Sequence, residues 1–131
     1  MKRILKYLAI TTFLFAICNV GFAQKVKVEV VDFHSTNRCI SCKSIEANAK
    51  KTVEAYFAEQ QNVSFKVYNV DKKENSEVAK EFQAAGTSLF LKVTRDGKTE
   101  VVNLTQFAFM NARNEDNFIN GLRSKIEEYL L

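Results

Sequence analysis

Two cysteines separated by two residues, Cys39 and Cys42, are the groups in this sequence whose type and spacing best support chemistry. A thiolate is a nucleophile, and two thiols this close can attack a disulfide and then close into a disulfide of their own. A bridge between residues so near in the sequence closes a very short loop, so in the chain-entropy account it adds little stability. The pair therefore indicates a reactive role rather than a stabilising one.

The same two thiols admit two other interpretations. One is a metal site: structural zinc needs four ligands, and the chain adds only His34, its single histidine, whereas Cu(I) could bind two thiolates. The other is a binding domain that keeps the cysteines incidentally. This is the weakest of the three interpretations, because exposed vicinal thiols do not stay inert in an oxidising compartment. The redox interpretation requires no metal and no cofactor, and a copper-delivery module is its alternative.

The first residues of the chain have the pattern of an export signal. Three basic residues within the first six precede an uncharged, mostly apolar stretch over residues 7–18, and small residues stand at −3 and −1 of a cut after Ala23. The stretch is shorter than the ~20 residues that a membrane-spanning helix needs. The sequence thus predicts a signal peptide over residues 1–23 and a periplasmic or otherwise exported protein. A lipid-modified Cys18 is the alternative, disfavoured by the bulky Ile17 before it.

The remaining residues, 24–131, are enough for one domain with one hydrophobic core. The signal segment carries three of the 19 basic residues and none of the 15 acidic ones, which leaves 16 basic and 15 acidic residues and a net charge of +1. This balance offers no basic surface for a nucleic acid. We expect a monomeric domain whose only thiols are those of Cys39 and Cys42.

Apolar periodicity predicts an α/β domain. Four segments alternate or run continuously apolar, as strands do: residues 26–33, 63–70, 89–93 and 101–104. Three segments have helical spacing: from residue 42 to about 60, after residue 75, and from 114 to the end. Asp96-Gly97 favours a hairpin with a primed turn, and residues 106–113 are expected to be a connection. This order predicts a four-stranded mixed sheet, βαβ followed by ββα, with helices on both faces.

Cys39 falls where the first predicted strand gives way to the first predicted helix. A thiolate there faces unpaired backbone N–H groups and the positive end of the helix dipole. A helix terminus supplies about 1 kcal/mol, or ~2 when partly buried, whereas lowering a thiol pKa by two units takes roughly 2.7 kcal/mol. The basic neighbours Arg38 and Lys43 are therefore expected to add to the stabilisation. Cys42, one turn inside the helix, is expected to be more buried.

The segments around the cysteines resemble the thioredoxin superfamily. Three segments carry the resemblance to its strand with active-site loop, its next strand and its hairpin: residues 30–43, 67–71 and 86–98. The resemblance covers essentially the whole mature chain, except that the family's usual first strand and helix have no counterpart. It implies a minimal thioredoxin-like fold and a thiol-disulfide oxidoreductase. The direction of exchange is not fixed by the sequence: with the export signal, the protein is either an exported oxidant or, as we prefer, an exported reductase fed by a membrane thiol transporter. Cys39 then attacks protein or small-molecule disulfides, and Cys42 resolves the mixed disulfide.

The resemblance also assigns a role to Asp32. The residue resembles the family's buried acid, which assists proton transfer to and from the resolving cysteine. The alternative is an ordinary strand-end carboxylate paired with a lysine. His34 is expected to support the edge of the site rather than to act as a base or ligand.

Three features depart from the family's pattern. Arg38 stands where the family carries Trp, and Ile40-Ser41 stand where it carries Gly-Pro. The family's cis-proline cannot exist, because the chain has no proline. Thr87 and Ser88 occupy that region, where a hydroxyl could stabilise the thiolate and where substrate docking must differ. We expect a trans peptide there, since a non-proline cis bond costs about 3 kcal/mol.

Overall fold

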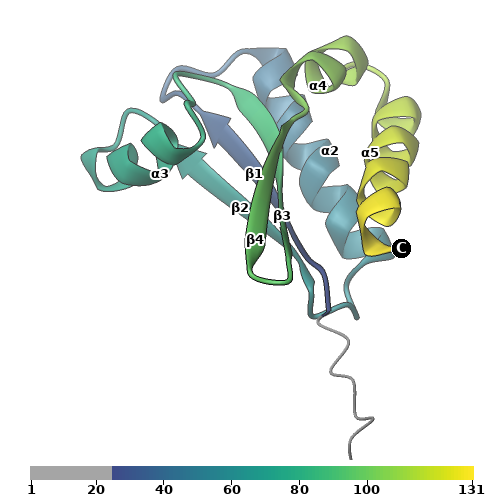
Figure 1. Cartoon of the computed structure of the whole chain (residues 1–131). Helices are drawn as coiled ribbons and strands as arrows, with labels where there is room; N and C mark the ends of the chain where they lie inside the picture. Colours follow the sequence, from purple (N-terminus) through teal and green to yellow (C-terminus); the bar gives the residue numbers. More distant parts are fainter. Residues whose placement is uncertain (1–24) are drawn as a thin grey trace, which may run out of the picture.

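The computed structural model describes residues 25–131, which form a four-stranded sheet flanked by helices (Figure 1). The strands are β1 (Lys27–His34), β2 (Val63–Asn69), β3 (Ser88–Arg95) and β4 (Lys98–Asn103). Their order is β2-β1-β3-β4, with β1 and β2 parallel and the other neighbours antiparallel. The predicted mixed sheet is confirmed. The predicted signal peptide, with Cys18, lies outside the described residues.

Helices cover both faces of the sheet, as predicted. Helices α2 (Ile40–Tyr56), α4 (Thr105–Asn111) and α5 (Glu115–Leu130) lie on one side, and the short η1 (Lys73–Asn75) and α3 (Ser76–Glu81) lie at the other (Figure 1). Among the described residues no helix is both long enough and apolar enough to cross a membrane. One face of the sheet is therefore covered by three helices of residues 25–131 and the other by two short ones. Helix α2 runs along the centre of the face that has three.

Strand β1 is the centre of the sheet and divides its side chains between the two faces. Val28 and Val30 belong to the larger core, with Ile45 of α2 and residues of α5. Phe33 points the other way, into an aromatic cluster with Phe82 and Phe90, whose ring centroids lie 5.3–5.8 Å apart. Because side chains alternate along a strand, Asp32 shares the face of Val28 and Val30, beneath α2.

Glu29 is the charged residue that β1 buries on the opposite face, where only 6% of it is exposed. Its carboxylate pairs with Lys66 of β2, whose Nζ lies 2.5 Å away, and with Lys27, at 3.4 Å. Burial raises the pKa of Glu29, but the hydrogen bond and charge of Lys66, with the charge of Lys27, outweigh it and hold that pKa below its ordinary value. Glu29 is thus an ionised buried group with its charge compensated.

The hairpin between β3 and β4 turns at Asp96 and Gly97, as predicted. Both residues have positive φ angles, of 51° and 73° respectively. Two consecutive residues in this region match the type I′ turn, whose twist suits the flanking strands.

The predicted connection over residues 106–113 is wrong, because most of it forms α4. Leu104, Ala108 and Ala112 are buried at four-residue intervals, which is the spacing of one helix face. Residue Leu104 occupies the N-cap position and its side chain makes no capping hydrogen bond. The Oδ1 of Asn103, one residue earlier, accepts from the first backbone N–H of α4 at 2.9 Å, so the start signal of this short helix stands one residue before its usual place.

Helix α4 packs closely on α5 through Phe107 and Gly121. The ring of Phe107 lies 5.5 Å from that of Phe118, centroid to centroid. A Cβ atom placed on Gly121 would lie 2.6 Å from Cε2 of Phe107. A side chain at position 121 would thus force the ring of Phe107 to move.

We expect Gly121→Ala to destabilise the protein. Alanine is favoured over glycine within a helix by about 1 kcal/mol, but forcing a methyl group into a packed contact costs about 1–3 kcal/mol. The free energy of unfolding in urea should therefore fall by about 1 kcal/mol. In a Phe107→Ala background, Gly121→Ala should instead raise the free energy of unfolding. If Gly121→Ala raised it in the otherwise unchanged protein, the close Phe107–Gly121 contact would be contradicted.

Candidate active site

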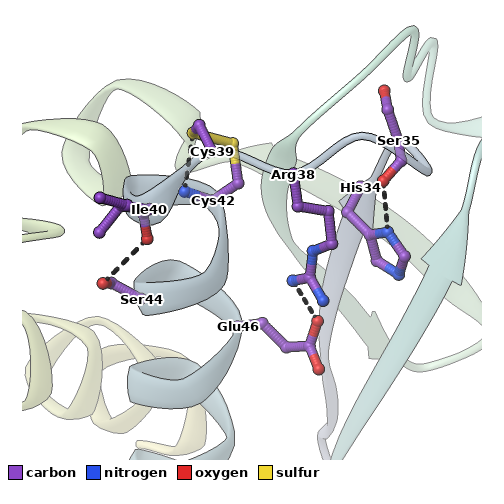
Figure 2. The surroundings of a disulfide bond; sticks show 8 residues. All are labelled: His34, Ser35, Arg38, Cys39, Ile40, Cys42, Ser44 and Glu46. Atoms are coloured by element: carbon purple, nitrogen blue, oxygen red, sulfur yellow. Dashed lines mark hydrogen bonds and ion pairs between the residues drawn. A yellow bond between two sulfur atoms is a disulfide. The ribbon is translucent and has the colours of Figure 1, made fainter.

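Cys39 and Cys42 form a disulfide at the N-terminus of α2, with their Cα atoms 5.0 Å apart (Figure 2). Cys39 is the N-cap residue of α2 and has extended backbone angles. Its Sγ accepts a hydrogen bond from the backbone N–H of Cys42 at 3.0 Å. The sulfur thus occupies the place where an oxygen of Ser or Asp usually caps a helix. A thiolate formed there faces a backbone donor and the positive end of the dipole.

The two cysteines differ in exposure, as predicted. Cys39 is exposed, whereas Cys42 is only 8% exposed, one turn inside α2. Ile40, which follows Cys39, is 69% exposed. The cysteine that caps α2 is therefore open to solvent, and the cysteine one turn inside the helix is shielded from it.

Asp32 lies on β1, fully buried, on the face that α2 covers. Neither of its carboxyl oxygens has a hydrogen-bond partner among residues 25–131, and no lysine of that range pairs with it. Burial raises the pKa of Asp32 to about 8; the negative charge of Glu46 raises it as well, and the positive charge of Arg38 opposes the rise. A carboxyl with this pKa can bind and release a proton near neutral pH.

The guanidinium of Arg38 forms an ion pair with the carboxylate of Glu46 on α2. Figure 2 shows the side chain of Arg38 directed along α2 toward Glu46 and away from the disulfide. Its charge is therefore shared with an acid, rather than directed at the sulfur of Cys39 as the sequence suggested. Glu46 was not singled out from the sequence. The available signal was its position four residues after Cys42, which places both on one helix face.

His34 and Lys43 make no hydrogen bond to the sulfur atoms of the disulfide. The Nδ1 of His34 donates to the carbonyl oxygen of Ser35 at 2.9 Å, and the imidazole is turned away from the disulfide (Figure 2). Lys43 is exposed, and its backbone N–H donates to the carbonyl of Cys39 at 3.1 Å. Within residues 25–131 no group of three or more His, Cys, Asp or Glu side chains is placed to hold a metal ion, which leaves the two cysteines as the ligands of any Cu(I) site.

Thr87 and Ser88 stand at the start of β3, in the region of the missing proline. No peptide bond is cis within residues 25–131, so the expected trans peptide is confirmed. Ser88 is buried and its hydroxyl donates to the carbonyl of Gly86 at 3.0 Å. Its hydroxyl is thus used inside its own turn, while Thr87 is half-buried.

Replacing Asp32 should make stability less dependent on pH. The pKa is about 8 in the folded protein against an ordinary 3.8, so the folded state holds the proton more tightly than the unfolded one. The stability associated with this proton is complete below pH ~4 and is lost as the pH rises through ~8. Asp32→Asn cannot ionise, so in the oxidised protein it should raise the free energy of unfolding by on the order of 5 kcal/mol at pH 9 and much less at pH 5. If Asp32→Asn changed the free energy of unfolding in urea equally at pH 5 and pH 9, the raised pKa of the buried Asp32 would be contradicted.

Comparison with known proteins agrees with this geometry. The family profile described as Thioredoxin matches residues 16–124, well over half of the chain. Among solved structures, the chain is similar to a thioredoxin from Thermus thermophilus, with 22% identity over 76% of this chain and 74% of that one and a TM-score of 0.51. It is also similar to thioredoxin NaTrxh from Nicotiana alata, with 30% identity over 80% and 75% of the two chains and a TM-score of 0.47. No match was found among curated proteins.

The first of these similarities bears out the fold class that the sequence implied. The order β2-β1-β3-β4, with one parallel pair and flanking helices, is an α/β thioredoxin-like arrangement. Together with the matched profile and the Cys39–Cys42 pair, it supports thiol-disulfide exchange as the general class of chemistry. By the extent of the profile match, the chain belongs to the thioredoxin family.

Proposed function

We propose that the protein is an exported disulfide reductase that acts through a mixed disulfide on Cys39. The observation that carries the proposal is the pairing of an exposed sulfur at the N-terminus of α2 with a buried one a turn inside. An attacking thiol needs thiolate character and access, whereas a resolving thiol must wait until the mixed disulfide has formed. The two cysteines meet these different needs.

The reaction has two exchange steps. The Cys39 thiolate attacks one sulfur of a substrate disulfide, and the other substrate sulfur leaves as a thiolate that takes up a proton. Cys42 then loses its proton, attacks Sγ of Cys39 and displaces the second substrate sulfur. Two electrons pass to the substrate, and the protein is left with the disulfide drawn in Figure 2.

Asp32 is the proton acceptor for Cys42 in this scheme. It is fully buried on the face of β1 that α2 covers, with a pKa of about 8, close to the ~8.5 of a free thiol. A proton moves most easily between groups of matched pKa, in either direction. The ionised form of Asp32, a minor fraction at pH 7 with this pKa, can therefore take the proton of Cys42 on oxidation, and the protonated form can return a proton on reduction.

The oxidised pair must be reduced before the next cycle. On the export side we assign this step to a membrane thiol transporter that supplies a dithiol. The substrates are protein or small-molecule disulfides, which the protein meets as a monomer. Exposed Ile40 beside Cys39 and half-buried Thr87 at the start of β3 are the groups that we assign to docking.

The two cysteines should differ sharply in trapping. Cys42→Ser removes resolution, so exported Cys42→Ser protein should accumulate mixed disulfides through Cys39, separable on non-reducing gels. Cys39→Ser leaves only a buried thiol and should trap at least roughly tenfold less. Equal trapping by the two variants would remove the asymmetry on which the mechanism depends.

A copper-delivery module remains the competing function, because Cys39 and Cys42 are also the thiols that would bind Cu(I). Titration of the reduced protein with Cu(I), beside a redox titration against glutathione, separates the two. Tight stoichiometric copper binding by a protein that traps no disulfide partner would favour the metal module.

The mature protein should begin at Gln24. Cleavage after Ala23 predicts an unmodified N-terminus, which mass spectrometry of the exported protein would show directly. Peptides from residues 1–23 should be missing from that material. A lipid-modified Cys18 as the first residue would contradict the prediction and place the domain on a membrane surface.

A further inference from the structure

The ion pair between Arg38 and Glu46 connects the loop before α2 with the second turn of that helix. Arg38 directly precedes the exposed Cys39, and Glu46 lies one helical turn beyond the buried Cys42. Both side chains are largely buried, with 20% and 29% of their areas exposed. The Nε of Arg38 is buried without a hydrogen-bond partner among residues 25–131. The pair is therefore partly withdrawn from water, where charges act over longer distances than at the surface.

Chain direction brings this pair to Asp32. Strand β1 and helix α2 run past each other in opposite senses, so the end of β1 lies beside the start of α2 (Figure 1). Ile45 packs with the Val28 and Val30 face of β1, and Asp32 is the next residue of that face toward the disulfide. The charges of Glu46 and Arg38 both act on Asp32, in opposite directions.

Few other ionisable groups face this carboxyl. From α2 this is Glu46, and from the preceding loop it is Arg38. The neighbouring strands place Val67 of β2 and Leu89 of β3 in register with Asp32, and neither titrates. Helix α4 carries no ionisable side chain. The residues that α5 buries are all apolar, so among residues 25–131 the Arg38–Glu46 pair is the charged surrounding of Asp32 in the oxidised protein.

We propose that Arg38 and Glu46 are positioning residues for thiol exchange, a cation and an anion held together beside buried Asp32 so that this carboxyl can take up and return the proton of Cys42. The inference rests on the proposed function and adds a pair of residues to it. Glu46 makes Asp32 hold its proton more tightly, and Arg38 makes it release the proton more easily. Loss of either partner leaves the other charge uncompensated next to Asp32.

The test is the titration midpoint of Asp32, followed by the carboxyl carbon-13 resonance in oxidised protein, where neither cysteine titrates. Glu46→Gln removes an anion and frees Arg38, so the midpoint should fall by about one pH unit. Arg38→Gln removes the cation, so the midpoint should rise by about one pH unit. Glu115→Gln, which breaks the Lys51–Glu115 pair between α2 and α5, is the matched control and should leave the midpoint unchanged.

The pH profile of mixed-disulfide resolution provides the second readout. The midpoint of this profile should fall in Glu46→Gln and rise in Arg38→Gln. In an Asp32→Asn background neither substitution should move it. If the pair only tethers the loop to α2, both variants lower stability and the midpoints stay in place or move together, which would overturn the inference. Because the resonance is followed without any substrate, this result is independent of whether Cys42→Ser traps partners.

Discussion

A carboxyl group that is shut away from water without a hydrogen-bond donor is costly to ionise, and this constraint organises the site. Asp32 is fully buried on the central strand and lacks any such donor among residues 25–131. The fold can carry it because the group is neutral at moderate pH, with a pKa of about 8. A position that costs stability when charged is thereby available for proton transfer, and the surrounding charges determine when the charge forms.

The start of α2 gives the two sulfur atoms different environments. The backbone donor at Cys42 and the helix dipole favour a negative charge on the exposed Cys39, while burial disfavours one on Cys42. A single helix terminus thus separates the properties of two chemically identical side chains three residues apart. Since Asp32 lies on the face of β1 that α2 covers, the proposed mechanism has the inner thiol lose its proton and the carboxyl take it up on the same side of the sheet.

Much of the fold and the centre of the site could be predicted from the sequence, because they depend on local signals. The cysteine spacing, the alternation around Asp32 and the Asp96-Gly97 turn are each readable within a few residues. Helix α4 was missed because Leu104 supplies no capping oxygen and its apolar spacing spans little more than two turns. The position of Glu46 was missed for another reason: it is one of two acids on a helix that also carries three lysines, and only the tertiary fold shows that it faces Arg38.

Strand β1 also carries Glu29, whose environment is the opposite of that of Asp32. Lysines hold the pKa of Glu29 below its ordinary value. The contribution of ionised Glu29 to the free energy of unfolding is therefore present at neutral pH and is lost as the medium turns acidic. The share of Asp32 is lost as the medium turns alkaline. Two carboxyls three residues apart, on opposite faces of one strand, therefore set an acid limit and an alkaline limit. Selection for work in a more acidic or more basic surrounding could move either limit by changing one neighbouring charge, leaving the disulfide and the helix that carries it untouched.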